Sequence, residues 1–393
     1  MEDSKKTNQT RILEYIFRNG PVSRTVIAEN TNINSSTVTN LTKTMLDLGI
    51  IQVLGEDPND LTPGRKQILI DINPDYACAV GVEFNENQIS FCITNLGGKV
   101  LAQKVSCTTA AEVENITDFL IQNIDEISHG SLELRKKIVA IGIAMPGKLN
   151  RETNRLFDET GSWKNFEPER LRERFHCPVV LENNVKCMAC GYYLFKREKT
   201  PETFSFFHLG KGIYCATIRN GEMITDENYI IGEIGHTIVN VGGQKCSCGK
   251  YGCLHTLASE RWLLKTARLW MESSQATILK QVAGDQPLTI EHLIMAYKLG
   301  DPIVEKMLND AMKYLSVSIS NLFIMLNPTK IFLHGKLFDE KQISDRLFAH
   351  MHQDLTYFGN NYSSYIEIVP CNGLDGAIGA SAKAIRTAFI DNI

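Results

Sequence analysis

The sequence has no surplus of basic residues and no long hydrophobic run. Its 41 Lys and Arg residues are outnumbered by 45 Asp and Glu residues, so the formal charge is −4. This balance excludes nucleic-acid binding through overall charge, and any DNA-binding role must depend on a local pattern. No stretch reaches the roughly 18 apolar residues that a membrane helix needs. We therefore expect no membrane partner.

A signal peptide and a disulfide framework are also missing. Residues 1–10 are polar, which predicts a cytoplasmic protein. In that compartment, the eleven cysteines are expected to be reduced thiols or metal ligands. The composition, 43% apolar and 22% charged over 393 residues, is that of a soluble globular protein with two or three domains.

The first 70 residues carry the pattern of a winged helix-turn-helix, a mainly α-helical fold. Three short helices are predicted from apolar residues at helical spacing: one around 12–17, one capped by Ser23, and one that begins at 34–36. The third carries an apolar stripe of Val38, Leu41, Met45 and Leu48. Gly49 ends it, and strands at 50–54 and 66–70 form a hairpin around a loop at 55–64.

The polar face of the third helix is the candidate DNA-reading surface. Short hydrogen-bonding side chains on such a face can enter a major groove and reach base edges. An ordinary solvated helix is the alternative, but the hairpin and six basic against three acidic residues between 5 and 50 favour DNA. The predicted DNA contacts are Ser35, Ser36, Thr37, Thr39, Asn40, Lys43, and Arg65 and Lys66 at the base of the wing.

Residues 71–393 predict an α/β region built twice on one pattern. The first set has strands at 76–83, 88–94, 99–106 and 138–144, with a helix at 110–127. The second set has a helix at 185–195, strands at 203–209 and 213–219, and helices at 263–272, 289–299 and 303–326. Repeated lobes of this kind usually hold a ligand in the cleft between them.

Four potential metal ligands occur within 18 residues. His236, Cys246, Cys248 and Cys253 offer one imidazole and three thiolates, which suit tetrahedral Zn(II). Four protein ligands leave no open position, so the zinc is predicted to be structural. A loop of reduced cysteines and a redox use of the same thiolates are the alternatives.

The motif around these ligands resembles the signature of the ROK family of repressors and sugar kinases. Gly232-Glu-Ile-Gly-His236 is followed by Cys-x-Cys-Gly-x-x-Gly-Cys-Leu254, and similar motifs occur at 142–147, 181–184 and 377–380. With its winged helix, the chain is similar to the transcriptional-regulator branch, which includes xylose and N-acetylglucosamine repressors. The resemblance implies an actin-like, hexokinase-type two-lobe domain. We expect the DNA-binding domain at 1–70, the first lobe at 71–186 plus 377–393, and the second lobe, with the zinc loop, at 187–376.

Against the kinases of this family, the residues for phosphoryl transfer are degenerate. A phosphate cradle like Asp-x-Gly-Gly-Thr becomes Glu83-Phe84-Asn85-Glu86, and one like Gly-Thr-Gly becomes Gly210-Lys211-Gly212. A Gly-Gly pair on the adenosine side becomes His334-Gly335. The Asp that serves as base is Asn184, and an amide has no useful basicity near neutral pH.

The sugar side is better preserved. The resemblance implies ligand contacts at Asn183, Glu233 and His236, while Asn184 can still form hydrogen bonds. Asn184 and His255 are therefore also predicted ligand contacts, although His255 stands where the family has a glutamate. Purely structural roles are the alternatives: Asn183 as a cap, Glu233 as a group that orients the zinc ligand, and His255 as a surface histidine.

The sequence thus predicts a transcriptional regulator, most simply a repressor of carbohydrate-metabolism genes, that binds operator DNA and a sugar or sugar derivative. It is predicted not to be an enzyme and to act as a homodimer or homotetramer. A ligand would shift the population of lobe closures and so the spacing of two winged helices. The alternatives are an ATP-dependent sugar kinase with a DNA-binding appendage, and a protein-interaction module without a ligand.

Overall fold

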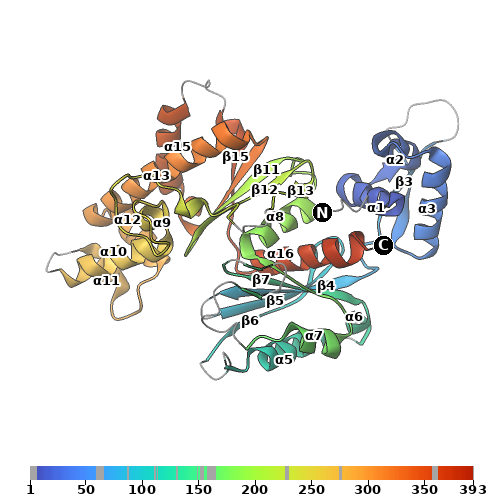
Figure 1. Ribbon diagram of the computed structural model, residues 1–393, viewed down its shortest axis with the longest axis horizontal. Coiled ribbons are helices and arrows are strands. Elements are labelled where there is room, and N and C mark those ends of the chain that lie inside the picture. Colours follow the sequence, from blue (N-terminus) through green and yellow to red (C-terminus); the bar gives the residue numbers. More distant parts are fainter. Residues whose placement is uncertain are drawn as a thin grey trace. The chain divides into compact units, whose positions relative to one another are not determined.

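The computed structural model describes residues 7–58, 66–85, 88–109, 112, 114–129, 132–147, 149–150, 155–156, 165–225, 230–273, 277–355 and 362–392. The chain divides into two compact units (Figure 1). Unit 1 comprises Met1–Thr200 and Gly373–Ile393, and unit 2 comprises Pro201–Asn372.

Unit 1 begins with the three predicted helices and the predicted hairpin. These elements are α1 (Asn8–Asn19), α2 (Arg24–Thr31), α3 (Ser35–Asp47), β2 (Ile51–Glu56) and β3 (Ile68–Ile72). Each helix starts at a polar side chain that accepts a hydrogen bond from the first turn: Thr7, Ser23 and Asn34. Local capping therefore sets the helix boundaries that the sequence pattern indicated.

The winged helix differs from the prediction in two respects. A short strand, β1 (Val22–Ser23), pairs antiparallel with β3, so that the wing is a three-stranded sheet of order β1-β3-β2. Leu48, which was expected on the buried stripe of α3, is 57% exposed because the helix ends one residue before it. Thr42 is buried instead, and its hydroxyl donates to the carbonyl of Val38 at 2.8 Å.

A five-stranded mixed sheet forms the rest of unit 1, in the order β10-β7-β4-β5-β6. Its strands are β4 (Cys78–Asn85), β5 (Gln88–Asn95), β6 (Val100–Cys107), β7 (Ile138–Met145) and β10 (Val179–Asn183). One face is covered by α8 (Asn184–Phe195) and α16 (Asp375–Ala384), and the other by α5 (Ile116–Ser128) and α7 (Pro168–Phe175) (Figure 1). The short elements α6 (Leu132–Lys136), β8 (Leu149–Asn150), β9 (Arg155–Leu156) and η4 (Ile385–Ile390) complete it.

Unit 2 repeats this sheet. Its strands are β11 (Phe204–Leu209), β12 (Ile213–Arg219), β13 (Glu222–Met223), β14 (Lys330–His334) and β15 (Ile366–Val369), in the order β13-β12-β11-β14-β15. In both sheets, three antiparallel strands are followed by two parallel ones. The predicted duplication of the β-β-β-α-β pattern is therefore confirmed.

The helices of unit 2 pack around one large apolar core. They are α9 (His255–Ala258), α10 (Glu260–Glu272), α11 (Ile278–Ala283), α12 (Ile290–Lys298), α13 (Pro302–Leu326), α14 (Lys336–Asp339) and α15 (Lys341–Leu355), with single turns η1 (Ile234–His236) and η3 (Tyr362–Tyr365). In the part of the chain that the structure describes, no helix is both long and apolar enough to span a bilayer.

The lobe boundaries differ from the predicted ones. The predicted divisions at 186/187 and 376/377 fall inside α8 and α16, whereas both helices belong whole to unit 1. The physical reason is that α8 and α16 pack against each other and, through α16, against β4 and β7 of the first sheet. Helix packing of this kind cannot be located from a periodic pattern alone.

Candidate functional site

The predicted DNA-reading residues gather on one side of α3. Ser35, Ser36, Thr39, Asn40 and Lys43 are exposed, and Thr37 is half-buried. Val38 and Met45 point into the core on the opposite side. The helix therefore presents a continuous polar face to solvent.

Some of these polar groups are already engaged within the helix. The hydroxyl of Ser36 donates to Asn34 Oδ1 at 2.9 Å, and that of Thr39 donates to the carbonyl of Ser35 at 2.8 Å. The side chains of Asn40 and Lys43 make no hydrogen bond to any residue that the structure describes. Lys66 is half-buried just before β3, and Arg65 lies outside the described residues.

The basic residues of the winged helix do not all face solvent. Arg18 is only 9% exposed, and Arg11 donates to the carbonyl of Thr31. Arg24 Nε donates to the hydroxyl of Thr42 at 2.8 Å. The local positive charge counted from the sequence is therefore partly committed to internal contacts, and the count could not separate the two uses.

The four predicted metal ligands form one cluster in unit 2. The candidate ligand atoms of His236, Cys246, Cys248 and Cys253 all lie within 4.8 Å of one another. Cys248 Sγ is 3.6 Å from Cys253 Sγ, and Cys246 Sγ is 3.5 Å from His236 Nδ1. Donor atoms around a tetrahedral zinc ion, with bonds of about 2.0 to 2.3 Å, are about 3.3 to 3.8 Å apart. The donor set and its spacing therefore fit zinc.

The loop that carries the cysteines is held by its backbone. Isolated bridges join Ile238 to Cys253 and Lys245 to Tyr251. Gly252 has φ of +73°, and a Cβ there would lie 1.7 Å from the carbonyl oxygen of Asn240. Only glycine fits this position, because a side chain would force apart the two strands that bring the thiols together.

The buried thiol of Cys253 needs a nearby cation to ionise near neutral pH. Burial, and then the neighbouring thiols of Cys248 and Cys246, raise the pKa of Cys253 to about 12. A metal ion reverses this effect because it favours the thiolate. Zinc bound here would supply a structural cross-link between η1 and the cysteine loop.

Two further predicted residues lie beside the cluster. Glu233 Oε2 is 3.9 Å from His236 Nε2, and the rings of His236 and His255 are 5.6 Å apart. Burial, and then His236 and Arg261, lower the pKa of His255 to about 4. The neutral His255 ring can thus both donate and accept a hydrogen bond at physiological pH.

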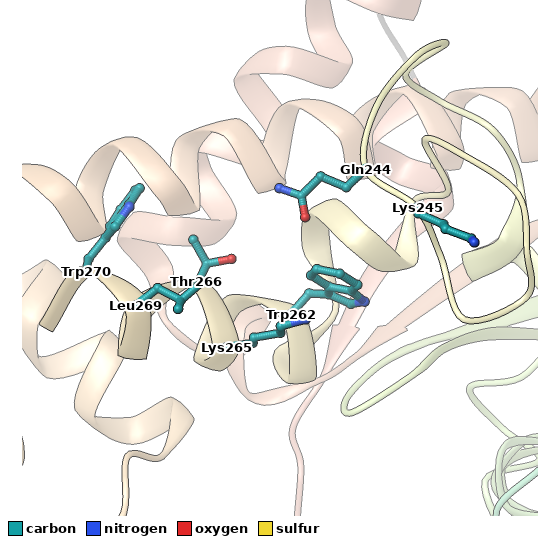
Figure 2. Close-up of a pocket in the computed structure, with 7 residues that line it drawn as sticks. All are labelled: Gln244, Lys245, Trp262, Lys265, Thr266, Leu269 and Trp270. Atoms are coloured by element: carbon teal, nitrogen blue, oxygen red, sulfur yellow. The ribbon is translucent and has the colours of Figure 1, made fainter. Parts of the chain in front are cut away.

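A shallow pocket of about 480 Å³ borders the cysteine loop (Figure 2). Gln244 and Lys245, which immediately precede Cys246, form one wall, and the exposed side of α10 forms the other. Trp262 and Trp270 line that side, and Lys265 Nζ lies 4.4 Å from the centre of the Trp262 ring. Since the chain has three tryptophans, two of them report on the surroundings of this loop.

Asn183 and Asn184 occupy the start of α8 in unit 1. Asn183 Oδ1 accepts from the backbone N–H of Val185 at 2.9 Å and of Lys186 at 3.3 Å, and its Nδ2 donates to the carbonyl of Gly147 at 3.0 Å. The side chain is therefore the N-cap of α8, the structural role that the sequence left open.

The amide of Asn184 is tied to a buried carboxyl group. Its Nδ2 donates to Glu83 Oε1 and to the carbonyl of Phe84, both at 3.2 Å. Its Oδ1 is buried and has no hydrogen-bond partner among the described residues. Burial, and then Asp375, raise the pKa of Glu83 to about 7. This contact was not predicted, because 101 residues separate the two side chains in the sequence.

The predicted ligand contacts thus fall into two groups. Asn183 and Asn184 lie together in unit 1, and Glu233, His236 and His255 lie together in unit 2. Each group combines hydrogen-bond donors with acceptors, as recognition of hydroxyl groups requires.

Unit 2 also contains a buried histidine pair where the resemblance implies nucleotide-binding glycines. His208 Nδ1 lies 2.8 Å from His334 Nδ1, at the ends of adjacent strands β11 and β14. Burial, and then His334, lower the pKa of His208 to about 3. An uncharged His208 imidazole offers no attraction to a phosphate group.

Two family models match the chain. The model described as "ROK family" matches residues 79–386. The one described as "Winged helix-turn-helix DNA-binding" matches residues 6–52.

Curated relatives cover most of the chain. The xylose repressor of Bacillus subtilis (strain 168) is 23% identical over 396 residues, which cover 98% of this chain and 95% of the relative. The DNA-binding transcriptional dual regulator NagC of Escherichia coli (strain K12) is 24% identical over 347 residues, which cover 86% of this chain and 82% of the relative.

Solved structures share the fold. A ROK family transcriptional regulator described as a homologue of the E. coli MLC protein gives a TM-score of 0.77 at 20% identity, covering 98% of this chain and 96% of that chain. A ROK family glucokinase from Streptomyces griseus, in complex with glucose and AMPPNP, gives a TM-score of 0.65 at 22% identity. The match covers 79% of this chain and 100% of the glucokinase chain. The predicted fold, a winged helix followed by an actin-like domain of the sugar-kinase type, is confirmed. Because the family model spans most of the sequence, the chain belongs to the ROK family.

Proposed function

We propose that this ROK protein is a sequence-specific DNA-binding repressor of carbohydrate-metabolism genes, and that its ROK domain responds to a sugar or sugar derivative. The observation that carries the proposal is the exposed polar face of α3, on which Asn40 and Lys43 have no partner among the described residues. The relatives named repressors, which align over the winged helix as well as the ROK domain, support it.

The geometry of α3 suggests how DNA is read. Its N-terminal residues Ser35 and Ser36 would face the groove first, with Asn40 placed to pair with a base edge and Lys43 with a phosphate. Thr37 and Thr39 would contribute hydroxyl contacts, and Arg65 and Lys66 would contact the backbone from the wing. Two copies of the chain, in a homodimer or homotetramer, would read two half-sites.

Selection from a pool of random duplexes, followed by binding titrations at several salt concentrations, tests this interface. Asn40→Ala should relax the preference at a base pair, at a cost of about 1 to 3 kcal/mol. Lys43→Ala should weaken binding to every sequence and lower the salt slope by about 1. Lys313→Ala, an exposed lysine of α13 in unit 2, is the matched control. Unchanged affinity and slope in both α3 variants would refute the proposed reading face.

The same protein is proposed to have no kinase activity. Asn184 stands at the position of the base, and its Nδ2 is held by the Glu83 carboxyl group and the Phe84 carbonyl. An amide cannot accept the proton of a sugar hydroxyl. A coupled assay of ADP formation with pentoses, hexoses and amino sugars should show no turnover. Clear sugar-dependent ADP formation would establish the alternative, a kinase with a DNA-binding appendage.

Effector recognition is proposed to use the polar groups that remain. The unpartnered Asn184 Oδ1 can accept a hydrogen bond from a sugar hydroxyl, which would satisfy a buried acceptor. Asn183, Glu233, His236 and His255 are the other proposed contacts. For His236, the Nδ1 side faces the thiols and the Nε2 side faces Glu233, so that a metal and a hydroxyl would use different ring nitrogens.

We propose that the cysteine cluster holds one structural Zn(II) through His236, Cys246, Cys248 and Cys253. The distances between the donor atoms support this assignment. The ion would fix η1, which ends at His236 and directly follows Glu233, so that both proposed ligand contacts are held in one conformation. Metal analysis of the purified protein should find one zinc per chain.

A further inference from the structure

A buried arginine joins the winged helix to the rest of unit 1. Arg18, near the end of α1, donates to the carbonyl of Tyr193 at 2.6 Å and to that of Thr200 at 2.7 Å. Its guanidinium group also lies 4.1 Å from the centre of the Tyr193 ring. Both carbonyls belong to α8 or to the segment that follows it. A desolvated arginine with this many partners holds α1 in one position on α8.

A second arginine, which follows α8, contacts the winged helix. Arg197, which follows α8, pairs with both carboxylate oxygens of Asp71 in β3, at 3.1 and 2.7 Å. The same side chain donates to the carbonyl of Phe17 at 3.1 Å, at the end of α1, where the helix dipole favours a cation. Arg197 therefore contacts the winged helix at two places, in α1 and in β3 of the wing.

The C-terminal segment contacts the same parts of α1 and α8. Arg386, in η4, pairs with Glu14 of α1 at 2.9 Å and lies 5.6 Å from the centre of the Tyr193 ring. Apolar side chains of α1 share one buried cluster with Leu194 of α8 and Ile385 of η4. The winged helix is thus docked on the ends of α8 and of the segment that extends α16.

The opposite end of α8 carries the proposed effector contacts. Asn183 caps this helix and Asn184 is its first residue, whereas Tyr193 lies in its last turn. The 12 residues of α8 span about 18 Å. A Cβ on Gly379 of α16 would lie 2.4 Å from the backbone of Cys187, so the two helices touch backbone to backbone. Such close packing makes α8 move as one body.

We infer that Arg18, Tyr193 and Arg197 form a latch through which a change at Asn184 sets the position of the winged helix. The inference rests on the proposed function, in which Asn184 contacts the effector. The latch residues are positioning residues, because they lie outside the reading face of α3. Without the latch, the reading face of α3 and the effector contacts persist. DNA binding by α3 then no longer responds to a change at Asn184.

A double-mutant cycle tests the latch without knowledge of the effector. Asn184→Ala perturbs the start of α8, and Arg18→Met cuts the latch while keeping an apolar stem. DNA affinity is measured, on a duplex selected by the wild-type protein, for each single variant and for the double variant. Distant sites that do not communicate give additive effects. We expect Asn184→Ala to change the dissociation constant about threefold or more in the wild-type background and less than about 1.5-fold beside Arg18→Met.

Further variants test whether the loss of coupling is specific to the latch contacts. Arg18→Lys keeps the charge but cannot reach both carbonyls, so it should also break the coupling. The pair Asp71→Asn with Arg197→Gln removes the ionic grip without leaving a buried charge unpaired. Arg170→Met, which cuts an exposed ion pair with Asp118 in α5 on the opposite face of the sheet, should leave the coupling intact.

Hydrogen exchange separates failure of the latch from failure of the proposed function. Exchange of α1 amides should change with Asn184→Ala only when Arg18 is present. If the wild-type protein selects no DNA sequence, the proposed function fails, and the exchange cycle alone then decides the latch. Additive effects of Asn184→Ala and Arg18→Met, on DNA affinity or on α1 exchange, would overturn the inference.

Discussion

Glu83 and Asn184 form a polar pair between β4 and the start of α8. Glu83 is 5% exposed, and its carboxyl group accepts a hydrogen bond from the side-chain amide of Asn184. Because the donor is an amide, the pair is compatible with either protonation state of Glu83. A carboxylate at position 184 would not be compatible with an ionised Glu83, since two negative charges would then share one buried site.

We predict that Glu83→Gln stabilises the protein above pH 7. Burial raises the pKa of Glu83 from 4.5 to about 7. The folded state therefore holds a proton that the unfolded state has lost, and stability falls as the pH rises from about 4.5 to about 7. Glutamine abolishes this loss, so the gain at pH 8 should be about 1 to 3 kcal/mol. Urea unfolding of the variant at pH 5 and pH 8 measures it.

Glu173→Gln, at an exposed position of α7, is the matched control and should behave like the wild type. An equal effect of Glu83→Gln at both pH values would contradict the raised pKa of Glu83.

We predict that Asn184→Asp does not restore a kinase. Aspartate loses the donor to Glu83 and to the Phe84 carbonyl and places a second carboxyl group beside the first. The expected cost is about 1 to 3 kcal/mol at pH 8, with no sugar-dependent ADP formation. Adding Glu83→Gln should recover part of the lost stability, which unfolding curves of the three variants will show. An active and equally stable Asn184→Asp protein would contradict this account.

The cysteine loop is the element on which the second unit's candidate site depends. Removing the proposed zinc ion should loosen Gln244 and Lys245, which form one wall of the tryptophan pocket (Figure 2). We predict that Cys246→Ser or Cys248→Ser abolishes metal binding and lowers Tm by about 4 to 8 °C, more than any single proposed sugar contact. A chelator should produce the same shift in the wild type and change the fluorescence of Trp262 and Trp270.

Cys107→Ser, at an exposed cysteine of β6, is the control for that experiment. Cysteine variants with unchanged metal content and unchanged Tm would rule out a structural zinc site.

The local elements could be predicted from the sequence, and the contacts between distant segments could not. The start of α3 follows from the Asn34 cap, and the cysteine cluster follows from ligands within 18 residues, because both depend on near neighbours. The strand β1 is only two residues long and exists because it pairs with β3. Arg18 counted only toward the local positive charge of the winged helix, because its partners Tyr193 and Thr200 lie more than 170 positions away.

At the scale of the whole molecule, the chain joins a DNA-reading helix to a duplicated fold that is shared with sugar kinases. Asn184 donates to Glu83 in unit 1, and the His208–His334 pair lies in unit 2. The winged helix is docked on the rest of unit 1 by three arginines. These features together describe a sensor whose output is DNA binding.

The most direct test of this claim is the affinity for a selected DNA duplex, measured by fluorescence anisotropy at about 150 mM salt, with and without each member of a panel of sugars and sugar phosphates. We predict that at least one compound changes the dissociation constant about 5-fold or more, without ATP. A DNA affinity that stays constant with every compound that binds the protein, or that does not exceed the affinity for random duplexes, would contradict it.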